Sequence, residues 1–250
     1  MLTDTPRQVL LALDTSTDRA AIGLKNGASF TELAWPAGRS QTTSLLMAID
    51  WLLDMSGLSI DDLKAIAVAS GPGTFTGLRV GLSLAKGLVL ARDLPLIGIP
   101  TLEVTAFPYQ AINVSVCAML PAGRGRIVWA ISEEGSALSA PTNSTVPEVI
   151  AMLTEHPHLL AVGEILDDHR QQIEAANVRT EPAALGSRRP AVLAQLAWDR
   201  WQVGDVDDAT LLEPTYIHGQ RATTAPVADR LLRKEKPARW RGSFGGTSFG

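Results

Sequence analysis

Apolar positions in the first part of the chain switch between short continuous runs and helical spacing. A run that ends at Asp14 is followed by two further apolar segments around the Asn26-Gly27 turn, which predicts an antiparallel meander of three strands. Apolar residues then recur at helical spacing over 41–56. A second helix is expected over 75–91, after a buried strand that ends at a glycine-rich stretch. This order of elements predicts an α/β unit.

The pattern begins again after a helical segment near residue 105. Strands are expected over 113–120, 125–133 and 158–163, and helices over 146–153, 165–176 and 188–202. We therefore expect residues 1–105 to form a first lobe and residues 106–220 a second, whose late segment packs back on the first. Residues 221–250 are expected to be a basic, disordered tail.

Composition is that of an ordinary globular protein, with 46% hydrophobic and 19% charged residues. No stretch has the length of apolar residues that a membrane span needs, and the first residues do not follow the signal-peptide pattern. The single cysteine, Cys117, lies in an apolar run and is expected to be buried. A soluble protein of the cytoplasm, without membrane contact, is predicted.

Charge is distributed unevenly along the chain. The net charge is −4, but residues 221–250 alone carry +5 and the remainder −9. An acidic body argues against a nucleic-acid surface on the main domain, whereas the tail, with Trp240, Phe244 and Phe249 near its arginines, has the composition for contact with phosphate and bases. Disorder without a binding role is the alternative for the tail.

The glycine-rich stretch, SGPGTFTGLRVGLSLAKG over 70–87, does not have the residues of a nucleotide loop. A Walker loop needs Lys and then Ser or Thr after its last glycine, but Leu78 and Arg79 follow Gly77. A dinucleotide fingerprint needs a third glycine where Thr76 stands.

Small residues instead recur every fourth position, beside an apolar stripe of Leu78, Leu82 and Val89. These small residues are Gly73, Gly77, Gly81 and Ala85. A row of this kind lets another element approach the helix closely. Packing within the chain's own domain and packing on a partner are both open at this point.

Four motifs together resemble the TsaB (YeaZ) family: LALDTST near the start, the glycine-rich stretch, LPLIGIPTLE, and EPTYIH near residue 217. The resemblance covers about residues 8–218. It implies the α/β actin-like/Hsp70/sugar-kinase fold, with two lobes that each contain a mixed sheet flanked by helices. It also implies a non-catalytic role as partner of TsaD in forming N6-threonylcarbamoyladenosine at position 37 of tRNAs reading ANN codons.

The resemblance implies that helices 41–56 and 75–91 contact TsaD. The interface residues it suggests are Leu45, Ile49, Leu52, Gly73, Gly77, Leu78, Arg79, Gly81, Leu82 and Ala85. TsaE is an implied further partner, tRNA is reached indirectly through the complex, and a homodimer and a monomer both stay open for the isolated chain. The chain is expected to have no cofactor of its own, with ATP or ADP bound at the complex.

Residues that would carry catalysis depart from the pattern of TsaD, which has a metal-binding histidine pair spaced HxxxH. Thr101 and Thr105 stand at the matching positions, and threonine is a poor ligand for such a metal. The histidines actually present are expected at the surface, without partners at ligand spacing; they are His156, His158, His169 and His218. No metal site is therefore expected.

The segment Asp14, Thr15, Ser16 and Thr17 retains some character of the phosphate loop of this fold. A hydroxyl-capped turn is an equally good interpretation, because no glycine follows the aspartate. In the second lobe Pro121 replaces an acid common among relatives, although Arg124 and Arg126 nearby suit an anion.

Two competing hypotheses follow. An active ATPase or phosphotransferase of the same fold would depend on Asp14, and a homodimer without a role for TsaD would use the same helices. Gln41, Pro121 and His218 mark the chain as a divergent member of the family.

Overall fold

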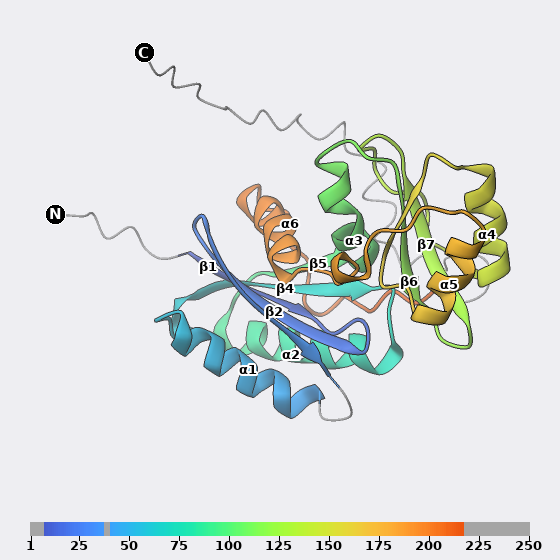
Figure 1. Cartoon of the computed structure of the whole chain (residues 1–250). Coiled ribbons are helices and arrows are strands. Elements are labelled where there is room, and N and C mark those ends of the chain that lie inside the picture. The colour runs from blue at the N-terminus through green and yellow to red at the C-terminus, as the bar shows by residue number, and fades with distance from the viewer. Residues whose placement is uncertain (1–7, 38–40, 218–250) are drawn as a thin grey trace, which may run out of the picture.

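The computed structural model describes residues 8–37 and 41–217. His218 and the basic tail therefore lie outside the described residues. Two β-sheets lie side by side, each with helices packed on it (Figure 1). The predicted α/β class with two mixed sheets is confirmed.

The first sheet has the strand order β3-β2-β1-β4-β5. Its strands are β1 (Val9–Asp14), β2 (Arg19–Asn26), β3 (Ser29–Pro36), β4 (Leu63–Gly71) and β5 (Leu96–Pro100). The first three form the predicted antiparallel meander, and β4 and β5 continue the sheet in parallel with β1. All six residues of β1 are buried, which explains why it is a continuous apolar run: helices cover both faces of the sheet.

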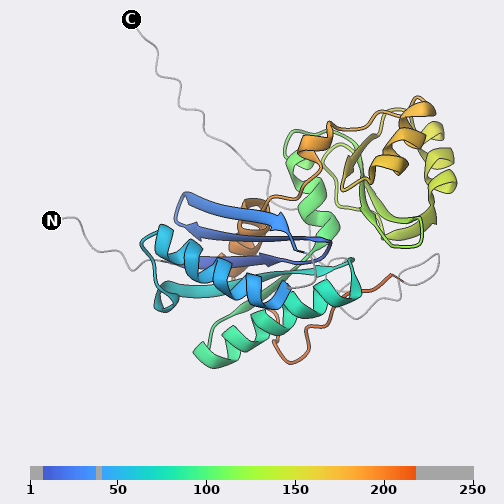
Figure 2. The same ribbon diagram turned by 60° about the horizontal axis from the view of Figure 1, so that its bottom comes forward.

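One face of this sheet is covered by α1 (Gln41–Met55) and α2 (Phe75–Arg92), and the other by α6 (Pro190–Gln202) (Figure 2). The predicted helices 41–56 and 75–91 are confirmed to within one residue. Helix α3 (Thr101–Gln110) contacts strands of both sheets. We call the first sheet with α1, α2 and α6 the first lobe.

The second sheet has the order β8-β7-β6-β9. Its elements are β6 (Val116–Pro121), β7 (Arg126–Ser132), β8 (Thr142–Thr145), α4 (Val146–Glu155), β9 (Leu160–Gly163) and α5 (Asp167–Ala175). We call these elements the second lobe. Helix α4 starts at a capping box in which Thr145 and Glu148 bond to each other, with Pro147 in its first turn.

The late part of the chain returns to the first lobe and then reaches the second again. Two short 3-10 turns, η1 (Ile60–Asp62) and η2 (Ala183–Leu185), complete the elements. After α6, Leu212 packs in the first-lobe core and Thr215 N–H donates to Ser70 O at 2.8 Å, whereas Ile217 packs in the second-lobe core. The segment after α6 therefore ties both lobes together.

Candidate functional site

The segment that follows β1 folds into a buried turn built around Asp14. Ser16 donates to Asp14 Oδ1 from its backbone N–H at 2.9 Å and from its hydroxyl at 2.6 Å. Asp14, Thr15, Ser16 and Thr17 are each 3% exposed or less. The arrangement is a turn closed by the aspartate, one of the two interpretations that the sequence left open.

Arg188, from the segment that precedes α6, completes this turn. Its Nε donates to Asp14 Oδ2 at 2.7 Å, and its Nη2 donates to Ser16 Oγ at 3.0 Å and to Thr17 Oγ1 at 3.2 Å. On its other side, Nη1 lies 3.1 Å from Glu164 Oε1 in an ion pair. The polar side chains in which the sequence suggested a phosphate loop therefore bind a guanidinium of the same chain.

Electrostatic interactions keep both Asp14 and Arg188 charged. Burial by itself raises the pKa of Asp14, but the Arg188 charge and the hydrogen bonds from Arg188 and Ser16 hold that pKa below its usual value. Burial likewise opposes the charge on Arg188, and the neighbouring Asp14 and Glu164 carboxylates raise its pKa above the usual value. The turn is consequently held by a buried ion pair between Asp14 and Arg188. Arg188 and Glu164 are the site residues that sequence reasoning missed.

The row of small residues explains how α2 reaches the same turn. A Cβ added at Gly73 would overlap the carbonyl of Ser16, and one at Gly77 or Gly81 would overlap Thr15. Thr74 N–H donates to Ser16 O at 2.7 Å, and Thr15 Oγ1 donates to Gly77 O at 2.7 Å. These glycines allow close packing of α2 on the chain's own β1 turn.

Most of the residues suggested for a partner interface are buried inside this chain. Leu45, Ile49, Leu52, Leu78, Leu82 and Ala85 are all at most 5% exposed. All of them except Leu78 belong to the first-lobe core, because the apolar faces of α1 and α2 cover their own sheet. Leu78 is buried beside Gly71 at the end of β4. A partner that binds without opening the first lobe cannot contact them.

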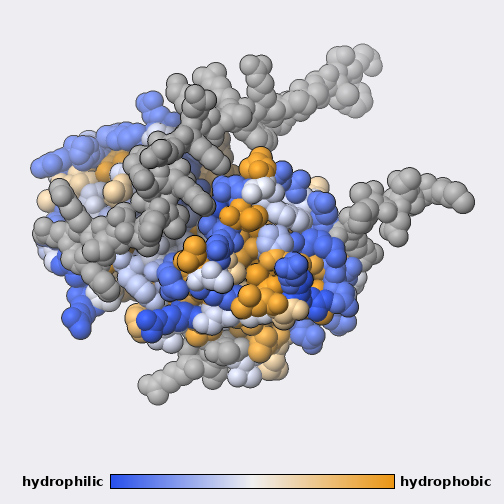
Figure 3. All heavy atoms as spheres, turned by 180° about the vertical axis from the view of Figure 1, so that it is seen from behind, coloured by the Kyte–Doolittle hydropathy of each residue, from blue (hydrophilic) through white to orange (hydrophobic). Residues whose placement is uncertain are grey.

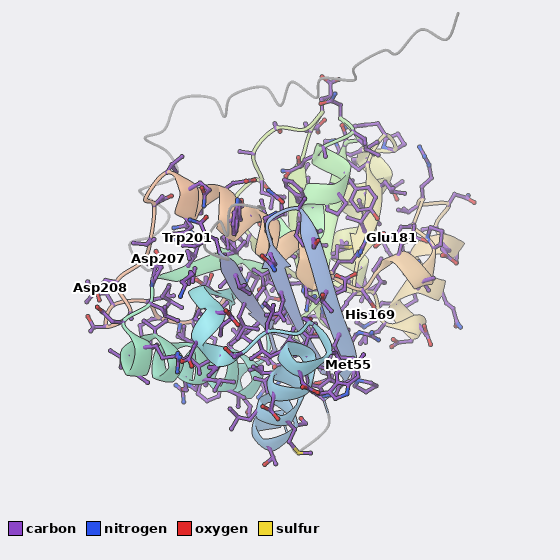
Figure 4. All side chains as sticks on the ribbon, turned by 90° about the vertical axis from the view of Figure 1, so that its left-hand side faces the viewer. Met55, His169, Glu181, Trp201, Asp207 and Asp208 are labelled. Atoms are coloured by element: carbon purple, nitrogen blue, oxygen red, sulfur yellow. The ribbon has the colours of Figure 1, made fainter. Side chains whose placement is uncertain are left out.

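The outer sides of the same helices carry large apolar side chains that are exposed. On α1 these are Leu46, Met47, Trp51 and Met55, with exposures of 50%, 68%, 52% and 65%; on α2, Phe75 and Leu90 are 55% and 71% exposed. Met47, Trp51 and Met55 are four residues apart and form a row along α1, a spacing that is visible in the sequence. We call these six residues the outer apolar face; Figure 4 marks Met55 at the end of α1.

Arg79 is the one suggested interface residue with an exposed side chain. Its guanidinium lies 3.6 Å from the centroid of the Phe75 ring, and its Nε donates to Tyr216 Oη at 3.3 Å. Arg79 thus connects the start of α2 to the late segment of the chain, and it extends the outer apolar face with a positive charge.

The described histidines lie in two different settings. His158 Nε2 is 3.1 Å from Glu133 Oε2 at the surface, and the rings of His156 and His158 are 5.9 Å apart. His169 was expected at the surface but is only 4% exposed, because it lies on the side of α5 that faces the second-lobe core. Figure 4 shows His169 and Glu181 in the second lobe, away from Trp201 in the first. Within residues 8–37 and 41–217, no group of three or more histidine, cysteine or acidic side chains is arranged to hold a metal ion.

Thr101 and Thr105 are both buried at the start of α3, where Thr105 Oγ1 donates to Thr101 O at 3.0 Å. Arg126 is committed to β8, since it donates to the side-chain and backbone oxygens of Asn143, both at 2.8 Å. Contact of Arg126 with an anion stays a prediction. Arg124 stays exposed at the tip of the β6–β7 hairpin.

Exposed apolar side chains also occur elsewhere, and Figure 3 shows hydrophobic residues in patches among hydrophilic ones on one face of the molecule. None of the described helices combines the length and the apolar content that crossing a membrane requires.

Comparisons with known proteins agree with this architecture. A family model described as "TsaD: tRNA N6-adenosine threonylcarbamoyltransferase" matches residues 36–178. The tRNA threonylcarbamoyladenosine biosynthesis protein TsaB of Escherichia coli (strain K12) is 35% identical over 123 residues, which are 48% of this chain and 53% of that protein. TsaB of Bacillus subtilis (strain 168) is 26% identical over 240 residues, 92% of this chain and 97% of the relative.

The match spans about half the length of the E. coli relative and of its Haemophilus influenzae counterpart. A solved structure, YeaZ from Pseudomonas aeruginosa, has the same fold, with a TM-score of 0.69 and 24% identity over 84% of this chain and 100% of that chain. Since the family model covers more than half of the chain, and relatives from E. coli, H. influenzae and B. subtilis are named TsaB, this chain belongs to the TsaD family and, within it, to the TsaB (YeaZ) proteins.

Proposed function

We propose that this protein is a non-catalytic subunit that binds TsaD and supports formation of N6-threonylcarbamoyladenosine at position 37 of tRNAs reading ANN codons. The observation that carries the proposal is the outer apolar face on α1 and α2. Large apolar side chains exposed on two helices that contact each other are typical of protein–protein contacts. The names of the TsaB relatives point to the same process.

The non-catalytic part of the proposal rests on residues in the turn after β1 and at the start of α3. Asp14, which an ATPase of this fold would use at its phosphates, is bound by Arg188 and Ser16. Thr101 and Thr105 occupy the positions of the histidine pair of TsaD and bond within α3. These contacts disfavour the active ATPase or phosphotransferase alternative.

In this proposal TsaE is a further partner, ATP or ADP acts at the complex rather than on the isolated chain, and tRNA is reached through TsaD. The tRNA modification takes place in the cytoplasm. A homodimer of the isolated protein would use the same outer apolar face, because burial of these exposed side chains is favourable whether TsaD or a second copy of the chain covers them.

Light scattering after size-exclusion chromatography tests the proposal on this protein, on TsaD from the same source and on their mixture. Trp51→Glu is expected to abolish the complex and tRNA modification, because a carboxylate at the centre of an apolar contact is desolvated without a partner. Ile112→Glu is the matched control, since Ile112 is also exposed but lies after α3.

A one-to-one complex that Trp51→Glu breaks and Ile112→Glu leaves intact would support the proposal. If the unchanged chain does not bind TsaD, or if Trp51→Glu binds it as tightly as the unchanged chain does, the assignment of this face is wrong. ATP hydrolysis by the isolated chain that Asp14→Ala abolishes would favour the alternative.

A further inference from the structure

One guanidinium connects the ends of two strands that belong to different sheets. Asp14 ends β1 in the first lobe, and Glu164 directly follows β9 in the second. Arg188 Nε is 2.7 Å from Asp14 Oδ2, and Arg188 Nη1 is 3.1 Å from Glu164 Oε1. The side chains of Arg188, Asp14 and Glu164 are 3%, 4% and 17% exposed, so water screens these contacts little.

The chain around Arg188 crosses between the lobes. Before it, Glu181 N–H donates to Ala161 O of β9 at 3.0 Å, which attaches this stretch to the second sheet. After it, α6 packs on the first sheet through Leu193, Ala194 and Ala197. On the first-lobe side, Arg188 bonds to Asp14, Ser16 and Thr17. Its ion pair with Glu164 is the contact by which this side chain reaches the second lobe.

A buried arginine between two carboxylates restricts geometry strongly. The planar guanidinium hydrogen-bonds in fixed directions to Asp14, Ser16 and Thr17. Its contact with Glu164 is an ion pair, and a buried charge that loses a partner is costly. Any rotation that separates β9 from β1 would remove one carboxylate from Arg188. The two strand ends are thereby tied to one relative position.

We propose that Arg188 is an intramolecular bridge that fixes the relative position of the two lobes, so that this position does not depend on a bound nucleotide or metal ion. A phosphate entering the turn after β1 would have to break this arrangement, because the backbone N–H and the hydroxyl of Ser16, which would donate to phosphate oxygens, already donate to Asp14 Oδ1. The inference is independent of the proposed binding to TsaD.

Glu164→Gln tests the bridge, because it removes the charge on the second-lobe side and leaves the pair of Arg188 with Asp14 in place. Glu32→Gln is the matched control: Glu32 pairs with the adjacent Arg189 at 2.5 Å, and both residues belong to the first lobe. Arg188→Lys keeps the positive charge but loses the planar fork. It serves as a second test, since Arg188→Ala would leave Asp14 and Glu164 unpaired and risks failing to fold.

Two measurements on the full chain report on lobe position. Spin labels at Gln202→Cys on α6 and Ala151→Cys on α4, both exposed positions, give the distribution of distances between the lobes. Amide hydrogen exchange of residues 14–17 and 163–167 reports on local opening. In Glu164→Gln and Arg188→Lys we expect a broader distance distribution and exchange that is faster by about tenfold, whereas Glu32→Gln keeps the values of the unchanged chain.

A distance distribution and exchange rates in Glu164→Gln equal to those of the unchanged chain would overturn the inference. It would also be overturned if Mg²⁺ and ATP, added to the unchanged chain, shift or narrow the distribution, because the lobe position would then depend on a ligand.

Discussion

The hydroxyl of Thr15 donates a 2.7 Å hydrogen bond to the carbonyl oxygen of Gly77 in the first turn of α2. One helical turn further, a Cβ at Gly81 would overlap that same hydroxyl oxygen of Thr15. The distance between α2 and the turn after β1 is therefore set by two glycines and one threonine, all within the first lobe.

Gly81→Ala is expected to destabilise the fold by about 1–3 kcal/mol, because its methyl group would push α2 away from Thr15. Chemical denaturation measures the effect. Gly87→Ala, on the same helix, is the control: its Cβ would meet no atom within 4 Å, so the higher helix propensity of alanine is expected to stabilise the protein by about 0.5–1 kcal/mol.

The double variant Thr15→Ala, Gly81→Ala tests the cause directly. Removal of the Thr15 hydroxyl makes room for the new methyl group, so the two changes together should cost less than the sum of their separate effects. Strict additivity would show that the Thr15 hydroxyl is not what Gly81 avoids.

A second prediction concerns acid. The pKa of Asp14 is lower in the folded protein than its ordinary value of about 3.9, so the folded state releases this proton more readily than the unfolded chain does. The resulting stability is present above the unfolded pKa and is lost as the pH falls through the lower folded pKa. We expect the free energy of unfolding to drop steeply in this window below about pH 4.

Asp14→Asn should remove this acid-dependent part and cost about 3–5 kcal/mol at neutral pH, since it takes one carboxylate from the buried Arg188. Urea unfolding at a series of pH values checks both effects. Asp54→Asn is the control, because Asp54 is exposed on α1. An acid dependence in Asp14→Asn as steep as in the unchanged chain would contradict the assignment.

Cys117 gives a third prediction. It lies in β6, fully buried in the second-lobe core, and burial raises the pKa of its thiol well above the usual range. An aromatic disulfide reagent at neutral pH is expected to label it at the rate at which the protein unfolds. Labelling in urea should accelerate in step with unfolding; fast labelling of the native protein, at the rate of an exposed thiol, would contradict the buried placement.

The sequence identified the elements of the fold well, because their signals are local. Helical spacing located α1 and α2, and the Asn26-Gly27 turn located the β2–β3 hairpin. Alternation and spacing report which residues share a face of an element. They do not report what covers that face, which explains why Leu45 was assigned to a partner although its own sheet covers it.

Contacts between distant parts of the chain had no such signal. Arg188 and Asp14 are 174 positions apart, and no spacing rule connects them. Helix α6 was expected within the range of the second lobe as a periodic segment, and its place on the first sheet depends on the path of the chain between the lobes. The sequence therefore predicted one part of the candidate site, the turn at Asp14. The other part, Arg188, was found only from the structure.

Two nearby residues of α1 lie on different sides of the helix, one in the core of the first lobe and one on the outer apolar face. Leu45 is fully buried in the core, whereas Met47, two positions later, is 68% exposed. Leu45→Ala is expected to lower the free energy of unfolding by about 2–5 kcal/mol, because it leaves a cavity under α1. Met47→Ala should change that free energy by less than about 0.5 kcal/mol, as for most surface substitutions.

Only one of the two variants should affect partner binding. Met47→Ala removes apolar area from the outer face and is expected to weaken the complex with TsaD, while Leu45→Ala, at a temperature where it is fully folded, should bind as the unchanged chain does. Denaturation and light scattering on the same samples measure both quantities. Weaker binding by folded Leu45→Ala, together with unchanged binding by Met47→Ala, would mean that the partner contacts the inner side of α1, which requires the first lobe to open.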